Sequence, residues 1–103
     1  MEPEIGMPAT YSIGSDDYPY TVIGVKRFKN GEVQSIQLQQ DTEILVSGST
    51  EDGSAQFTYE PNPNGHVIVA KPWTSNGYKY WKVVNGSAII YLGQRRYYRD
   101  PSF

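Results

Sequence analysis

Four Asn-Gly pairs constrain this chain more than any other feature, because each can join two β-strands through a tight turn. A two-residue type I′ turn needs positive φ at both central residues, and Asn and Gly adopt that conformation most easily. The runs between the pairs are short and rich in Val, Ile, Tyr and Thr, and they contain no useful apolar repeat of 3.6 residues. This pattern predicts an all-β domain built from hairpins.

The clearest predicted hairpin spans residues 78–92, with Asn85-Gly86 as its turn. Because side chains alternate between the two faces of a strand, this turn places Lys82 opposite Ile89 on one amphipathic face. The other face is apolar, so it is predicted to belong to the core. Its large side chains are Trp81, Val83, Ile90 and Leu92.

A second hairpin is predicted over residues 21–40, with Asn30-Gly31 as its turn. Gly24 lies in the middle of the first strand, where a glycine is typical of a β-bulge or a sharp bend. The apolar run 44–46 is predicted as a short buried strand or as the continuation of the previous one, and residues 72–77 are predicted as a loop. The predicted core face of this second hairpin consists of Ile23, Val25, Ile36 and Leu38.

The short strands of this 103-residue chain favour a single domain, residues 1–103, folded as a small antiparallel barrel of the SH3-like type. A small β-sandwich is the alternative, although it usually has more and longer strands. Residues 1–8 contain two prolines and are predicted as a loose lead-in. Residues 93–103 are predicted as a basic and aromatic C-terminal tail.

Composition argues against several classes of function. The chain has no Cys and one His, so we expect no metal, no cofactor and no enzymatic activity. A net charge of −2 argues against general nucleic-acid binding. No stretch has the pattern of a signal peptide or approaches the roughly 20 apolar residues of a membrane span, so we expect a cytoplasmic protein.

The charges are distributed unevenly along the chain. Residues 1–60 hold three basic and ten acidic side chains, whereas residues 61–103 hold six basic and one acidic. Such an asymmetry is typical of a directed contact surface. The alternative interpretation is that the two halves neutralise each other within the fold.

The candidate contact residues are mainly aromatic and basic. Arg supplies planar donors for phosphate or carboxylate, and Tyr and Trp are enriched at interfaces. The pattern suits an acidic protein surface or a small nucleotide-like anion. Alternatively, the tail covers an open sheet edge, and its arginines pair with the acidic half of the chain. The candidates are Arg95, Arg96, Tyr97, Tyr98 and Arg99 in the tail, and Trp73, Tyr78, Tyr80 and Tyr91 before it.

Two adjacent carboxylates, Asp16 and Asp17, form a further candidate within a polar loop. Adjacent residues in an extended chain point to opposite sides, so these two do not form a ready acid/base pair. A metal ion would need further oxygen ligands from elsewhere in the chain. The simpler interpretation is a solvated loop in which Asp caps backbone N–H groups.

Four segments resemble a group of small proteins encoded by tailed bacteriophages and prophages. They are residues 5–10, 14–22, 57–65 and the terminal Tyr-Arg-Asp-Pro-Ser-Phe at 98–103. The resemblance implies a phage protein in a bacterial cytoplasm, where such small proteins are often accessory factors, including inhibitors of host defence. It implies no catalytic residues.

These observations favour a binding protein that occupies a host protein or sequesters a small anionic, nucleotide-like signal. A structural or virion-associated protein, which would assemble as a homo-oligomer, is the alternative. An enzyme fits least, because the chain offers only scattered carboxylates and one His.

Overall fold

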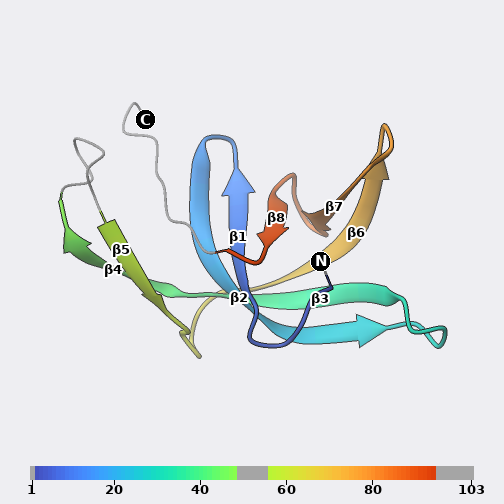
Figure 1. Ribbon diagram of the computed structural model, residues 1–103, viewed down its shortest axis with the longest axis horizontal. Helices are drawn as coiled ribbons and strands as arrows, with labels where there is room; N and C mark the ends of the chain where they lie inside the picture. Colours follow the sequence, from blue (N-terminus) through green and yellow to red (C-terminus); the bar gives the residue numbers. More distant parts are fainter. Residues whose placement is uncertain (1, 49–55, 95–103) are drawn as a thin grey trace.

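Eight β-strands make up the part of the chain that the computed structural model describes, residues 2–48 and 56–94 (Figure 1). Six of them form a closed antiparallel barrel in the order β1-β2-β3-β6-β7-β8, and β1 closes the barrel by pairing with β8. The predicted all-β fold with a small, SH3-like antiparallel barrel is confirmed. The strands are β1 (Pro8–Ile13), β2 (Asp16–Arg27), β3 (Val33–Gln40), β4 (Thr42–Ser47), β5 (Gln56–Glu60), β6 (Val67–Ser75), β7 (Tyr78–Val83) and β8 (Ile89–Leu92).

The core lies inside the barrel, where inward-facing side chains of neighbouring strands meet. Ile36 on β3 lies opposite Ala70 on β6, which in turn lies opposite Val83 on β7. All three side chains are buried. Most of the predicted core is confirmed: Ile36, Leu38, Val83 and Ile90 are buried, and Val25, Trp81 and Leu92 pack partly buried against them.

The prediction that Ile23 belongs to the core is wrong, because this side chain is 38% exposed on the outside of the barrel. A β-bulge in β2 separates the pair Val22–Leu38 from the pair formed by Gly24. A bulge inserts one extra residue, so the side chains before it change face relative to those after it. Val22 therefore occupies the buried position that the regular alternation gave to Ile23. The bulge itself was predicted from Gly24 and is confirmed.

The predicted type I′ turn at Asn85-Gly86 is also wrong, because neither residue has a positive φ. The tight turn is instead Asn76-Gly77, with φ values of 52° and 80°, between the paired residues Ser75 and Tyr78. Residues 72–77, predicted as a loop, are therefore the end of β6 and this turn.

A wider loop joins β7 to β8, because both of its ends are held by other parts of the barrel. The N–H of Val84 donates to the carbonyl of Val69 on β6 at 2.9 Å, and Ala88 is buried in the core. The predicted register of this hairpin nevertheless holds, with Lys82 opposite Ile89.

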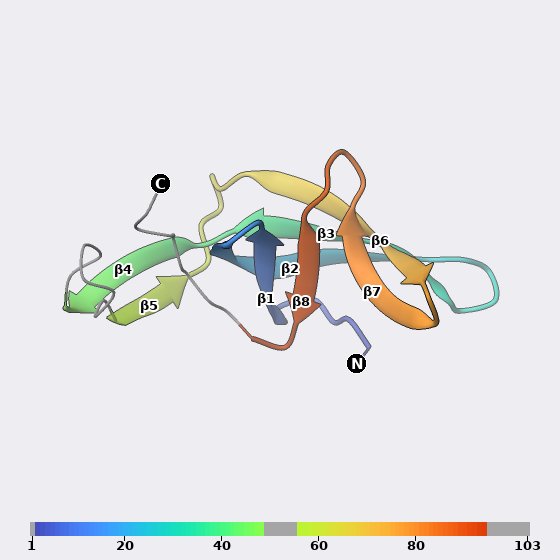
Figure 2. The ribbon, with the colours of Figure 1, turned by 90° about the horizontal axis from the view of Figure 1, so that it is seen from above.

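Strands β4 and β5 form a separate two-stranded sheet that projects from the barrel (Figures 1 and 2). Residues 44–46 were predicted as a short buried strand or the continuation of the previous one; they lie on β4, which follows β3 after one residue, and the predicted burial is wrong. Ile44, Leu45 and Val46 are 38%, 49% and 57% exposed, because β4 pairs only with β5 and leaves the barrel after β3. We call these two strands the β4–β5 arm.

The segment before β1, predicted as a loose lead-in, lies against β2. The N–H of Gly6 donates to the carbonyl of Val22 at 2.7 Å, and the N–H of Val22 donates to the carbonyl of Met7 at 2.9 Å. Pro3 is buried. Within the described ranges, no helix is long and apolar enough to cross a membrane.

Candidate functional site

Aromatic and lysine side chains gather on the outer face of β6, β7 and β8. The Asn76-Gly77 turn sets a register in which Trp73 lies opposite Tyr80 and Lys71 opposite Lys82. Since Ala70 and Val83 face the core in the same register, the residues next to them in the chain face outward. We call this surface the aromatic–lysine face, and it consists of Lys71, Trp73, Tyr78, Tyr80, Lys82 and Tyr91.

The centre of the aromatic–lysine face is a cation–π contact. The Nζ atom of Lys82 lies 4.8 Å from the centroid of the Trp73 ring. Trp73 remains half exposed, and Tyr78 is 76% exposed at the end of the hairpin. A half-exposed Trp next to a lysine is a surface with both apolar area and positive charge.

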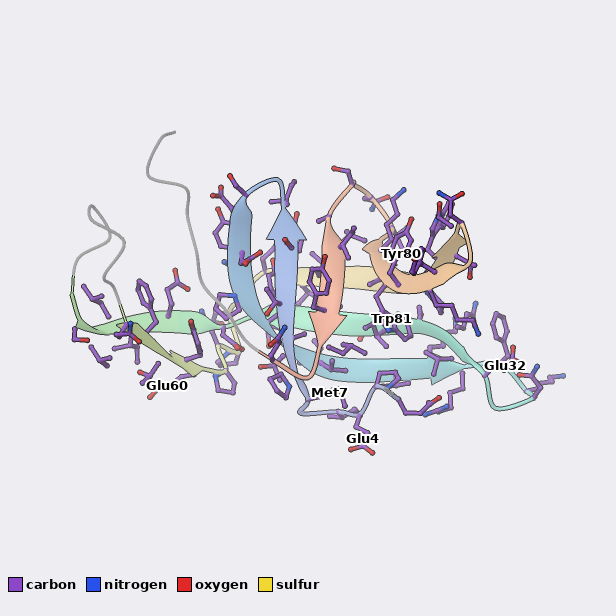
Figure 3. All side chains as sticks on the ribbon, turned by 45° about the horizontal axis from the view of Figure 1, so that its top comes forward. Glu4, Met7, Glu32, Glu60, Tyr80 and Trp81 are labelled. Atoms are coloured by element: carbon purple, nitrogen blue, oxygen red, sulfur yellow. The ribbon has the colours of Figure 1, made fainter. Side chains whose placement is uncertain are left out.

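Alternation along β7 places Tyr80 and Trp81 on opposite faces of the sheet. Trp81 packs against the core, whereas Tyr80 belongs to the outer face (both are labelled in Figure 3). On β8, Tyr91 follows the same alternation, because its neighbour Ile90 is buried. The predicted contact residues Trp73, Tyr78, Tyr80 and Tyr91 therefore do lie on one surface.

The two candidate aspartates are not part of this surface as a pair. Asp16 and Asp17 open β2, where they lie opposite Ile13 and Ser12 of β1, so their side chains leave on opposite faces of the sheet. Only Asp17 shares the outer side of the barrel, in a row with Ser12 and Ile89 that ends at Lys82. Three strand spacings separate it from Lys82, about 14 Å.

The remaining candidates, Arg95, Arg96, Tyr97, Tyr98 and Arg99, lie outside the described residues. The described chain ends at Gln94, whose carbonyl accepts a 2.8 Å hydrogen bond from the hydroxyl of Thr10. The tail therefore starts directly after β8, the strand that carries Tyr91.

Sequence reasoning placed Lys82 on the amphipathic face that also carries Tyr78, Tyr80 and Tyr91, and it missed Lys71. Lys71 joins this face through the pairing of β6 with β7, which was hidden while residues 72–77 were interpreted as a loop. The signal that reveals this pairing is the Asn-Gly pair at 76–77, read as a two-residue turn.

A cavity of about 270 Å³ lies at the base of the β4–β5 arm. Its wall contains the buried side chain of Asp41, whose Oδ1 accepts a 2.6 Å hydrogen bond from the hydroxyl of Thr21. The carboxylates of Asp41 and Glu43 line it and no basic side chain does, so it does not suit an anion. The lining residues are Gln40, Asp41, Thr42, Glu43, Asn62 and Gly65.

A tyrosine cluster fills one part of the barrel interior. The rings of Tyr11 and Tyr20 stack with centroids 5.3 Å apart, and Tyr18 lies 6.1 Å from Tyr11. Burial and, to a smaller extent, the neighbouring phenols of Tyr11 and Tyr18 together raise the pKa of the Tyr20 hydroxyl to about 12. Tyr20 therefore stays protonated near neutral pH, and the cluster belongs to the core.

No protein family, no curated protein and no solved structure matches this chain. Among the described residues, no group of three or more His, Asp or Glu side chains gathers in a way that could hold a metal ion. The fold and the face define a small antiparallel β-barrel with an exposed aromatic and basic sheet surface.

Proposed function

We propose that this protein is a non-enzymatic binding module that occupies an acidic, partly apolar surface of another protein. One observation carries the proposal: Lys82 lies 4.8 Å over the half-exposed ring of Trp73. Around this pair, the outward positions of β6, β7 and β8 hold three tyrosines and a second lysine and no acidic residue.

The chemistry of the face fits a protein partner. Tyr and Trp give large rigid contact areas, and such residues are the usual centres of binding energy at interfaces. Lysines around them attract an acidic partner and set its orientation. Trp73, Tyr78 and Tyr91 are at least half exposed, and the face lies on a barrel whose strands are held by a buried core, so it is presented without rearrangement.

A small nucleotide-like anion fits the structure less well. Small-molecule sites usually bury 70–90% of the ligand in a concave pocket. The aromatic–lysine face is a sheet surface, and the cavity beside the arm is lined by two carboxylates. A protein surface therefore suits the face better than a free nucleotide.

The resemblance to small phage proteins supports a setting for this binding. In a bacterial cytoplasm, a module that occupies a host defence protein would block its contacts without any reaction. In this proposal, the protein counteracts host defence by occupation. The aromatic–lysine face supplies the contact, and the arginines and tyrosines of the tail, residues 95–99, extend it.

A calorimetric titration with a defined probe tests the face. We expect wild-type protein to bind a peptide of alternating Glu and Leu and to ignore its Lys–Leu counterpart. The variant Trp73→Ala should bind the acidic peptide about 30-fold more weakly, since truncation of a central aromatic often costs about 2 kcal/mol or more. The double variant Lys71→Ala/Lys82→Ala should bind about tenfold more weakly.

The matched control is Lys26→Ala/Lys29→Ala, which removes the same charge from the β2–β3 hairpin and should leave binding unchanged. Equal weakening by both double variants would mean that only net charge matters. Tighter binding of ATP than of the peptide, lost in Lys71→Ala/Lys82→Ala, would replace the protein partner by a nucleotide-like ligand. In a strain with an active defence system, expression of wild-type protein should raise plaque numbers, and expression of Trp73→Ala should not.

A further inference from the structure

The β4–β5 arm is a second surface that the barrel leaves uncovered. Its strands pair with each other and barely contact the barrel strands. Both of its faces expose aliphatic side chains, because Ile44 and Leu45 point to opposite sides and are 38% and 49% exposed. A two-stranded sheet alone is marginally stable in water, so an arm of this kind gains from being covered.

The composition of the arm is complementary to that of the aromatic–lysine face. Its described residues, 42–47 and 56–60, contain two acidic side chains, Glu43 and Glu60, and no basic one. One side of the arm carries Glu43 and Leu45 opposite Tyr59 and Phe57. The arm is therefore an acidic and partly apolar surface, which matches the lysines and aromatic rings of the aromatic–lysine face.

The arm and the face of one molecule lie too far apart to meet. Figures 1 and 2 both show β4 and β5 at one end of the long axis and the β6–β7 hairpin toward the other, and the molecule is 48 Å long. A set of hydrogen bonds also holds the base of the arm to the barrel. The N–H of Asp41 donates to the carbonyl of Pro19 at 2.9 Å, and the N–H of Gln40 donates to that of His66 at 2.9 Å.

We propose that the β4–β5 arm of one copy docks on the aromatic–lysine face of a second copy. The inference rests on the proposed function, because it uses the same face and names its occupant. The two surfaces differ and lie at opposite ends of the molecule, so the contact is head-to-tail. A docked pair still has one free arm and one free face. Further copies can therefore add through the same contact, which produces a ring or an open chain.

A mixing experiment distinguishes this contact from every symmetric one. The arm variant is Ile44→Ser/Leu45→Ser/Val46→Ser, and the face variant is Trp73→Ala/Lys82→Ala. In sedimentation velocity, the apparent mass of wild-type protein should rise with concentration above the 11.6 kDa of one chain. Each variant alone should stay a single chain. An equimolar mixture should form a complex of two chains and no larger species, because it offers one intact arm and one intact face.

Two further variants guard against misinterpretation. Glu43→Lys keeps every apolar side chain of the arm and should weaken self-association about tenfold, which tests the charge if the triple variant unfolds the arm. Phe28→Ser removes an equally exposed apolar side chain, 51% exposed, from the β2–β3 loop and should leave self-association unchanged. A face variant that still self-associates would overturn the proposal in favour of an arm-to-arm contact.

The two proposals fail in different ways. The arm variant retains the face, so it should bind the Glu–Leu peptide as wild-type protein does. Wild-type protein that binds the peptide but stays a single chain up to millimolar concentration would overturn the head-to-tail contact and leave the binding module intact. If the face variant still self-associates, and neither wild-type protein nor the arm variant binds the Glu–Leu peptide, both the head-to-tail contact and the binding module are overturned.

Discussion

Tyr20 is the residue whose chemistry differs most from that of a free side chain. It is 3% exposed and stacks on Tyr11 inside the barrel. The barrel interior disfavours a phenolate, so burial raises the pKa of Tyr20 from 10.0 to about 12. The folded state therefore keeps a proton that the unfolded chain loses at lower pH.

This difference predicts that the protein loses stability in alkali. Below pH 10 both states hold the proton, so the free energy of unfolding is unaffected. Between about pH 10 and 12 the unfolded state binds fewer protons, so stability falls as pH rises, by at most about 2–3 kcal/mol. Urea unfolding at pH 8 to 11.5 measures the loss, and Tyr20→Phe should show a smaller slope. An equal slope in both proteins would assign it to other groups.

Single residues also show where sequence alternation stops being informative. Val22 and Ile23 are both β-branched and adjacent, and only the bulge before Gly24 decides which of them is buried. Gly24 indicates that a bulge is present. It does not indicate which neighbouring residue is the extra one, because that depends on how β2 pairs with β3, where Val22 lies opposite Leu38 and Gly24 opposite Gln37.

The two hairpins of β6, β7 and β8 show the same limit for whole elements. Asn76-Gly77 and Asn85-Gly86 are identical as dipeptides, but only the first forms a type I′ turn. Val84 continues its pairing to β6, and Ala88 enters the core, so the second loop widens. The predicted register of residues 78–92 holds although the turn type was wrong, because the wider loop is still centred on Asn85-Gly86 and keeps Lys82 opposite Ile89.

The gathering of Tyr80, Tyr91 and Lys82 on one face of the candidate site was predicted, whereas the contribution of β6 was not. Tyr80 and Tyr91 were placed on one face by the alternation of a single hairpin. Trp73 and Lys71 join them only through the pairing of β6 with β7. The exposed arm was missed because an apolar run such as 44–46 normally marks a core strand.

The loop at the base of the arm can be tested with two glycines that both follow an Asn. A Cβ on Gly65 would overlap the carbonyl oxygen of Gln40, whereas a Cβ on Gly86 would meet nothing within 4 Å. Gly65→Ala should therefore lower the free energy of unfolding by about 2 kcal/mol or more, because the backbone must move. Gly86→Ala should change it by less than about 1 kcal/mol. Urea denaturation compares them, and similar losses would contradict the close packing at the arm base.

For the whole molecule, the arm changes the shape. The radius of gyration is 14.5 Å, compared with about 13 Å for a compact chain of this length. The larger radius is consistent with an arm that projects from the barrel. The barrel holds nearly all the buried side chains, and the arm holds almost none. Stability is therefore unevenly divided between the two parts.

Hydrogen exchange should reveal this division. At a concentration where the protein is a single chain, amides of β4 and β5 should exchange at least about tenfold faster than those of β3 and β8. The arm can open without exposing the core, whereas the barrel strands exchange through global unfolding. Amides paired across Ile36 and Ala70 are the internal reference. Equal protection in both parts would show that the arm unfolds together with the barrel.

Because β1 pairs with β8, the barrel can close only late in the synthesis of the chain. Ala9 pairs with Leu92, so the first strand waits for the last one before its open edge is covered. At about 5–20 residues per second, a ribosome needs roughly 4 to 17 seconds to make the chain between them. During that interval the nascent chain contains β1, β2 and β3, but β1 has no β8 with which to pair. The sheet of the growing chain therefore has an unpaired edge at β1, and the barrel cannot close before β8 has been translated.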